Sequence, residues 1–176
     1  MDGVLVVDKP AGPTSHDIVD RARRALGTRR VGHTGTLDPF ATGVLPLCLG
    51  RATRLARFLT AGEKTYRATL RLGFATTTDD LTGEPLGEPQ RTDVTDESLR
   101  AALAGLVGRF DQVPPAFSAR QVDGRRLYEL ARRGEATARA ATPVEVQALD
   151  LLSRAGDTLE LEVRCSAGTY VRAIAR

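Results

Sequence analysis

Two strand-like segments joined by a short turn constrain the fold more than any other feature of this sequence. Residues 158–165 alternate apolar with polar or charged side chains, which is the period expected of a strand that buries one face. Residues 144–152 form a second expected strand, and Ala155-Gly156-Asp157 between the two segments has the composition of a tight turn. The two segments therefore predict an antiparallel hairpin.

Further strands are expected nearer the start of the chain. Residues 4–7 predict a short buried strand, and residues 66–72 alternate as a half-buried strand does. Residues 8–13 are crowded with proline and glycine and are expected to be irregular. Because strands cluster with hairpin-like connections, we predict an α+β fold with a mixed, mainly antiparallel central sheet flanked by helices.

Four helices are predicted from apolar positions three and four residues apart. In the second, Leu55, Ala56 and Leu59 are expected to face inward. The four are a helix capped by Thr14 or Ser15 and ended by Gly27, and helices over residues 51–59, over residues 99–106 after Thr95, and from Leu127 to Gly134.

The composition favours a globular protein of the cytoplasm. The 176 residues are 41% hydrophobic and 27% charged, which excludes disorder as the default. No run of 18 apolar residues exists and the first residues lack a basic, apolar leader, so neither a membrane span nor secretion is expected. Cys48 and Cys165 are far apart and are expected to be buried thiols in a reducing compartment.

The common motifs of cofactor chemistry are absent. The sequence has no glycine-rich phosphate loop, no dinucleotide fingerprint and no nucleophile elbow. His16 and His33 are the only histidines, which excludes a multi-histidine metal site. We therefore expect no metal and no cofactor, and either an enzyme that works without them or a binding module.

Basic side chains gather in two regions of the chain. Residues 1–62 carry nine basic against five acidic residues, residues 79–97 carry seven acids against Arg91 alone, and residues 98–133 carry seven arginines against three acids. Only Lys9 and Lys64 among the 25 basic residues are lysines, and guanidinium groups suit phosphate oxygens well. A GC-rich genome explains the arginine bias equally well. Two basic surfaces separated by an acidic surface loop are predicted, with nucleic acid as a partner.

The segment from Arg30 to Pro46 is the most unusual part of the sequence. It holds three glycines and two prolines between apolar flanks, which predicts a rigid, irregular loop that presents His33 and Asp38. Local pattern alone also fits an aspartate that caps a turn before Pro39 and a packed histidine. Spacing does not choose between these interpretations.

These residues closely resemble the signature of the TruB family of tRNA pseudouridine synthases. The resemblance covers essentially the whole chain and extends through six motifs in order, although Phe117 stands where tyrosine is common and Gln121 where lysine is usual. The motifs are Asp8-Lys9-Pro10-x-Gly12-x-Thr14-Ser15, Gly32 to Pro46 with Gly50-Arg51-Ala52-Thr53-Arg54, Lys64-Thr65-Tyr66, Pro114-Pro115-x-Phe117-Ser118-Ala119, Gly124-x-x-x-Tyr128-Glu129-Leu130-Ala131-Arg132, and Gly168-Thr169-Tyr170-Val171-Arg172.

The resemblance implies an isomerase that needs no cofactor or metal. Such enzymes break the N1–C1′ bond of a uridine in RNA, rotate the uracil and rejoin it through C5. Asp38 matches the catalytic carboxylate. Whether it attacks C1′, attacks C6 or removes a sugar proton stays open at the level of sequence.

The resemblance also assigns roles to three residues in the second half of the chain. Arg172 matches the arginine that pairs with the catalytic aspartate, Tyr66 the tyrosine that stacks on the target base and helps proton transfer, and Tyr170 a tyrosine of the uridine pocket. From local pattern alone, Arg172 is an ordinary first-turn arginine, Tyr66 a member of the apolar face of its strand, and Tyr170 a packing residue at a helix start.

Three residues near the catalytic motif complete the expected site. His33 matches the histidine that fills or supports the place in the T-loop vacated when the target uridine is flipped out. Thr36 is expected to contact the substrate. Lys9 is expected at the substrate site too, where its motif supports the catalytic loop.

The expected protein is thus a monomer acting on the T-arm of tRNA, at the T-loop uridine of conventional position 55. Residues 1–176 are expected to form a catalytic domain that is incomplete at its C-terminus, without the small RNA-binding PUA domain of the family. Two alternatives stay open. One is a synthase for another RNA uridine, including a guide-dependent one, and the other is a non-catalytic module that binds and refolds tRNA.

Overall fold

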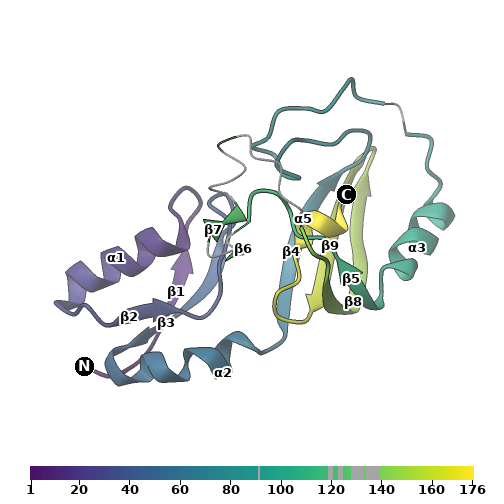
Figure 1. The fold of residues 1–176 in the computed structure, drawn as a ribbon. Coiled ribbons are helices and arrows are strands. Elements are labelled where there is room, and N and C mark those ends of the chain that lie inside the picture. Colours follow the sequence, from purple (N-terminus) through teal and green to yellow (C-terminus); the bar gives the residue numbers. More distant parts are fainter. Residues whose placement is uncertain (91, 119–120, 123–124, 128–132, 134–138) are drawn as a thin grey trace. The chain divides into compact units, whose positions relative to one another are not determined.

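The computed structural model consists of two units, Met1–Gly62 and Glu63–Arg176 (Figure 1). It describes the chain apart from residues 91, 119–120, 123–124, 128–132 and 134–138. Each unit has its own sheet and its own apolar core.

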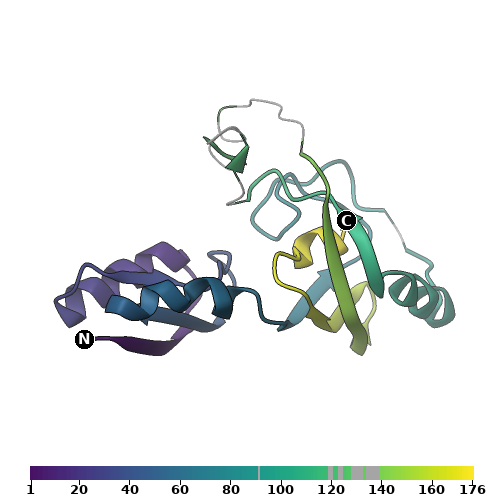
Figure 2. The same cartoon turned by 60° about the horizontal axis from the view of Figure 1, so that its bottom comes forward.

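The first unit is a three-stranded antiparallel sheet with a helix on one face. Its strands are β1 (Gly3–Lys9), β2 (Val31–His33) and β3 (Gly43–Leu49), in the order β1-β3-β2. Helix α1 (Ser15–Leu26) packs one apolar side against the sheet, while the 3₁₀ helix η1 (Gly50–Leu55) and α2 (Ala56–Thr60) follow β3 (Figure 2). The core between α1 and the sheet consists of Ile18, Val19, Val31, Leu45, Leu47 and Leu49.

Helix α1 is confirmed with both of its expected ends. The Thr14 hydroxyl accepts a hydrogen bond from the Asp17 amide at 3.1 Å, and the Asp17 carboxylate accepts from the Thr14 amide at 2.8 Å. This reciprocal cap satisfies two amide groups that the first turn leaves unpaired. Gly27 ends the helix in the left-handed conformation, with φ of 62°.

Two expectations for the first unit were wrong in part. The strand expected over residues 4–7 extends through Lys9, and it is not buried, because Val4 is 48% and Val6 64% exposed. The segment from Arg30 to Pro46 is not irregular throughout, since its ends form β2 and β3 and only residues 34–42 lie between strands.

Proline inside the central strand explains why that strand was missed. Pro46 pairs in register with Val6, and its carbonyl accepts a hydrogen bond from the Thr34 amide at 3.1 Å. A proline has no N–H with which to return a hydrogen bond to Thr34. Strand β2 ends at His33, one residue before that reciprocal bond would be needed. Strand β3 therefore tolerates Pro46, although a proline in the sequence argues against a central strand.

The helix expected over residues 51–59 is correct in place but not in packing. Its first part is a 3₁₀ turn, which advances by three residues per turn instead of 3.6. The inward face predicted from an α-helical period is therefore displaced, and Leu55 and Leu59 are 51% and 43% exposed.

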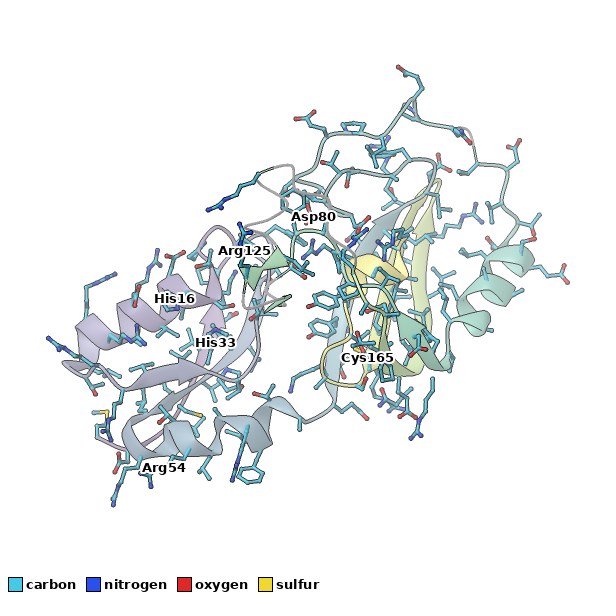
Figure 3. The ribbon with its side chains drawn as sticks, in the orientation of Figure 1. His16, His33, Arg54, Asp80, Arg125 and Cys165 are labelled. Atoms are coloured by element: carbon cyan, nitrogen blue, oxygen red, sulfur yellow. The ribbon has the colours of Figure 1, made fainter. Side chains whose placement is uncertain are left out.

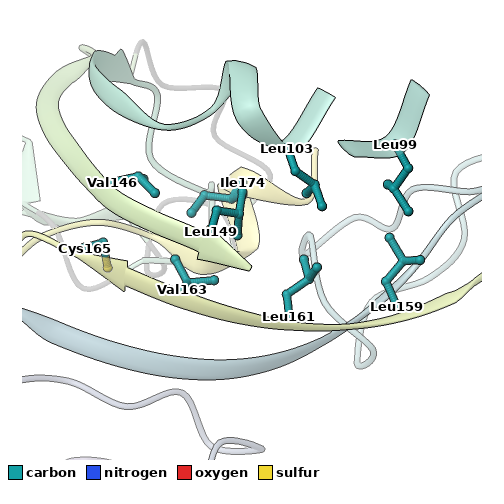
Figure 4. Close-up of a cluster of buried hydrophobic side chains, with 9 residues drawn as sticks. All are labelled: Leu99, Leu103, Val146, Leu149, Leu159, Leu161, Val163, Cys165 and Ile174. Atoms are coloured by element: carbon teal, nitrogen blue, oxygen red, sulfur yellow. The ribbon is translucent and has the colours of Figure 1, made fainter. Parts of the chain in front are cut away.

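The second unit is a four-stranded antiparallel sheet covered on one face. Its strands are β4 (Lys64–Arg71), β5 (Gly108–Gln112), β8 (Thr142–Ala155) and β9 (Thr158–Cys165), in the order β4-β9-β8-β5. Helices α3 (Asp96–Gly105) and α5 (Val171–Ile174) contribute to the core on that face, and β6 (Gln121–Val122) pairs with β7 (Arg125–Arg126) separately. Figure 4 shows Leu99 and Leu103 of α3 opposite Leu159 and Leu161 of β9.

The predicted hairpin, the strand at residues 66–72 and the helix after Thr95 are all confirmed. Ala155 pairs with Thr158 across the turn, and exposed and partly buried residues alternate along β4. Thr95 caps α3 by accepting a hydrogen bond from the Ser98 amide at 3.1 Å. The α+β class is confirmed, with every described ladder antiparallel. Most of the helix expected from Leu127 to Gly134 lies outside the described residues.

Both cysteines are buried thiols, as expected. Burial raises the pKa of the Cys48 thiol. Within the described residues, the structure contains no helix that is both long enough and apolar enough to cross a membrane.

Candidate active site

The loop between β2 and β3 holds Asp38 in a turn. The amide of Ala41 donates a hydrogen bond to the Asp38 carbonyl at 3.1 Å, and the Asp38 side chain is partly buried. His33 is the last residue of β2, and Thr36 lies exposed two residues before Asp38. The first unit therefore gathers four expected site residues, with Lys9 as the fourth (Figure 3 labels His33).

Lys9 holds the C-terminal part of this loop through backbone carbonyls. Its side chain is 0% exposed, and its ammonium group donates to the carbonyl oxygens of Pro10 at 3.0 Å, Pro39 at 3.2 Å and Ala41 at 2.6 Å. Three acceptors match the three protons of an ammonium group, which satisfies a charge that burial would otherwise destabilise. The side chain thus faces the loop backbone rather than solvent.

Burial and Asp38 act on Lys9 in opposite directions. Desolvation lowers the pKa of the Lys9 ammonium, while the negative charge of Asp38 raises it. The two side chains are therefore within electrostatic reach, and an ionised Asp38 favours the charged form of Lys9.

Ser15 fixes the other side of Asp38. Its hydroxyl is buried, donates to the Leu37 carbonyl at 3.1 Å and accepts from the Leu37 amide at 2.9 Å. The Gly12 amide also donates to the Pro39 carbonyl at 2.8 Å. The residues directly before and after Asp38 are thereby held by the N-terminal motif, so the carboxylate is presented on a rigid backbone.

The second unit holds the other three expected site residues. Tyr66 lies on the partly buried face of β4 and packs against the core of that unit. Tyr170 immediately precedes α5, and Arg172 lies in it. The packing expected of Tyr66 from local pattern alone is therefore present.

Arg172 is held by Asp80 and by two backbone carbonyls. Its guanidinium lies 3.4 Å from an Asp80 carboxylate oxygen, and both side chains are only 9% exposed. It also donates to the carbonyls of Thr78 at 2.9 Å and Phe117 at 3.0 Å. Three segments far apart in the sequence thus converge on one guanidinium. The expected pairing of Arg172 with Asp38 stays a prediction.

Asp80 is ionised in this environment. Burial raises the pKa of its carboxyl, but hydrogen bonds from the Thr82 hydroxyl and amide, a bond from Thr78 and the charge of Arg172 outweigh burial and hold the pKa below its ordinary value. The Thr78 hydroxyl donates at 2.8 Å and the Thr82 amide at 2.9 Å. A buried carboxylate that is so fully bonded can keep its charge.

Gln112 holds the backbone of Tyr170 in place. Its buried side chain bonds to both the amide and the carbonyl of Tyr170, at 2.8 Å and 3.1 Å. The Gln112 amide therefore pairs with the Tyr170 backbone as the backbone of a neighbouring strand would. The backbone that enters α5 is thereby tied to β5.

Sequence reasoning did not identify Asp80, Gln112 or Ser15 as parts of this arrangement. Asp80 was expected only as one acid of an exposed loop, and Ser15 as a helix cap and a member of the N-terminal motif, without its bonds to Leu37. A buried amide at the end of a strand offers no local signal. The described residues contain no cluster of three or more histidine, cysteine or acidic side chains that could hold a metal ion.

Comparison with known proteins adds independent information. Residues 23–171 match the TruB family pseudouridylate synthase (N terminal domain). The chain is 51% identical over 178 residues to tRNA pseudouridine synthase B of Mycobacterium ulcerans (strain Agy99), covering 99% of the chain and 59% of the relative. It is 52% identical over 180 residues to the enzyme of the same name from Gloeobacter violaceus, covering 100% of the chain and 61% of the relative. The chain thus spans about 60% of the length of these curated relatives.

Solved structures agree with this relationship. The crystal structure of a Cbf5-Nop10-Gar1 complex matches with a TM-score of 0.72 and 28% identity, over 98% of this chain and 42% of the other. A structure of an H/ACA RNP bound to a substrate RNA containing 2'-deoxyuridine matches with a TM-score of 0.68 and 26% identity, over 98% of this chain and 40% of the other.

Proposed function

The chain belongs to the TruB family of pseudouridylate synthases, and we propose from this that it carries the catalytic residues for isomerising uridine to pseudouridine in tRNA. The observation that carries the proposal is the loop of Asp38, which matches the family's motif and is held on both sides by Ser15 and Lys9. A rigid backbone positions a carboxylate for chemistry in a way that a flexible loop does not.

Asp38 is the catalytic carboxylate in this proposal. The reaction breaks the N1–C1′ bond of the uridine and forms a C5–C1′ bond, while the proton leaves C5 and N1 gains one. Atoms and charge balance without a cofactor, so a single ionised carboxylate is sufficient as the essential reagent. Attack on C1′, attack on C6 and removal of a sugar proton are all compatible with this residue.

The proposed target is the T-loop uridine at position 55, turned out of the folded RNA. Extrusion costs a few kcal/mol of stacking and pairing. His33 lies at the start of the Asp38 loop and is proposed to support the vacated position, and Thr36 is exposed for substrate contact. Lys9, which is buried against the loop, is proposed to serve the substrate site by fixing that loop.

The second unit supplies aromatic and cationic groups in this proposal. Tyr66 stacks on the base and assists proton transfer at C5, and Tyr170 contributes to the uridine pocket. Arg172 is the charge partner that keeps the catalytic carboxylate ionised, and its contact with Asp80 supports the role by fixing the guanidinium in place.

Pseudouridine mapping on an unmodified tRNA transcript tests the proposal. The protein should convert one uridine, at position 55, and should also act on a stand-alone T-arm stem-loop. Conversion of the full tRNA only with an added guide RNA would favour a guide-dependent synthase. Binding and refolding of tRNA without any pseudouridine would favour the non-catalytic module.

A further inference from the structure

A concave surface of the first unit is lined by five arginines. The concavity has a volume of about 520 Å³ and lies where α1, the turn before β2 and η1 meet (Figure 3 labels Arg54). Its cationic lining consists of Arg23, Arg29, Arg30, Arg51 and Arg54, which we call the arginine hollow.

The fold, and not the sequence alone, creates this cluster. Arg23 is near the end of α1, Arg30 directly precedes β2, and Arg54 lies some twenty residues further along in η1. Val31 pairs with Leu49, and the Gly50 amide donates to the Arg30 carbonyl at 2.8 Å. These bonds bring the start of β2 next to the start of η1.

The hollow keeps a surplus of positive charge. Arg23 is paired with Asp20 at 2.9 Å, and Arg51 with Asp2 at 2.8 Å. The side chains of Arg29, Arg30 and Arg54 are exposed, and none of the three guanidinium groups has a hydrogen bond or ion pair with a described residue. Three guanidinium groups are thus available to a ligand, and the two paired ones still add to the field.

We propose that the arginine hollow binds phosphates of the RNA backbone, outside the site of the reacting base. Guanidinium forks bind phosphate oxygens through two parallel hydrogen bonds, and several of them in one concavity fit a chain of phosphodiesters. The proposal rests on the proposed function in one respect, because it takes RNA as the polyanion.

The position of the hollow determines what it contributes. Strand β3 begins beside the Asp38 loop at Gly43 and ends beside the hollow at Leu49. At about 3.3 Å per residue, the two sites lie on the order of 20 Å apart along the strand. A phosphate in the hollow therefore belongs to a nucleotide several positions from the target, and the contact strengthens binding without taking part in chemistry.

Charge reversal tests the proposal. Arg30→Glu and Arg54→Glu should each weaken binding of an unmodified tRNA transcript about tenfold and reduce the slope of log K against log salt by about one. The single-turnover rate at saturating protein should stay within about twofold of wild type. Arg100→Glu is the matched control, because Arg100 is an exposed arginine of α3 that has no described partner and lies outside the hollow.

A second variant tests the same surface in the opposite direction. Asp2→Asn removes the charge that pairs with Arg51 but keeps a side-chain oxygen for the Arg51 amide. It should tighten RNA binding and steepen the salt slope, whereas unchanged or weaker binding would contradict the proposal.

The controls separate this inference from the proposed function. If Arg30→Glu, Arg54→Glu and Arg100→Glu bind tRNA with equal affinities and equal salt slopes, the proposal that the arginine hollow binds RNA is wrong, whatever the catalytic result. A wild-type chain that binds RNA through these arginines but makes no pseudouridine would leave the hollow standing and overturn the proposed activity.

Discussion

Gln112 bonds to Tyr170 through both ends of its side-chain amide, accepting from the Tyr170 N–H at 2.8 Å and donating to the Tyr170 carbonyl at 3.1 Å. Gln112 ends β5, and Tyr170 immediately precedes the helix that carries Arg172. A strand end and the entry to α5 are therefore fixed to each other through a single side chain, and with them the backbone of two proposed site residues.

Replacing Gln112 with leucine should loosen this segment. The change leaves the Tyr170 amide without its acceptor and removes one of two donors to the Tyr170 carbonyl, which still accepts from the Ala173 amide at 3.0 Å. An unpaired buried amide costs about 1–3 kcal/mol of unfolding free energy. Urea denaturation measures the loss. Gln112→Glu keeps an acceptor for the amide but has no donor for the carbonyl, so it should also destabilise, and wild-type stability in both variants would contradict the account.

Lys9→Met should affect the Asp38 loop more than the rest of the first unit. Methionine fills much of the same space but removes three hydrogen bonds to carbonyls, two of them in the loop at Pro39 and Ala41. We expect faster hydrogen exchange over residues 36–42 and at least tenfold lower activity. Protection in α1, which Lys9 does not bond, serves as the internal reference. Equal exchange in the loop of variant and wild type would show that Lys9 does not fix it.

Asp80→Asn should destabilise the second unit in a pH-dependent way. The folded-state pKa of Asp80 is depressed, so its contribution to stability is present above the unfolded value of about 3.9 and is lost as pH falls through the folded pKa. At neutral pH the variant should lose about 1.5–3 kcal/mol, the range for a hydrogen bond to a charged group. The difference from wild type should shrink below about pH 4. A difference that is the same at pH 7 and pH 3 would contradict an ionised Asp80.

These long-range contacts mark the limit of what the sequence predicts. The capping of α1 by Thr14, the turn at Gly156 and the alternation along β4 depend on neighbouring residues and were predicted correctly. The bond from Gln112 to Tyr170 spans 58 residues, and Arg172 draws partners from two other segments. No local pattern encodes such pairs.

The candidate site was predicted unevenly for the same reason. Its residue types follow from the motif around Asp38 and its likeness to a family. The motif of Lys9 was expected to support the catalytic loop, but the sequence does not reveal the contacts through which it does so, which are three backbone carbonyls. Local pattern also failed at η1, where a 3₁₀ turn replaces the regular helix that the apolar spacing predicts.

Tyr66 allows stacking and hydroxyl chemistry to be separated. Tyr66→Phe should keep the aromatic face and bind RNA as wild type does while losing turnover, and Tyr66→Ala should lose both. Because Tyr66 also packs against the core of its unit, thermal denaturation must accompany the kinetics, and Ala is expected to be the less stable variant. Turnover by Tyr66→Ala equal to wild type would rule out a role at the base.

The most direct test of the central claim is the rate of pseudouridine formation by Asp38→Asn, measured by tritium release from C5-labelled tRNA. Asparagine has nearly the same shape but no charge, and Ser15 and Lys9 bond only to backbone atoms of its neighbours, so the loop should keep its conformation. We expect no detectable pseudouridine while tRNA still binds with wild-type affinity. Turnover equal to that of the wild type would contradict the assignment of Asp38 as the catalytic carboxylate.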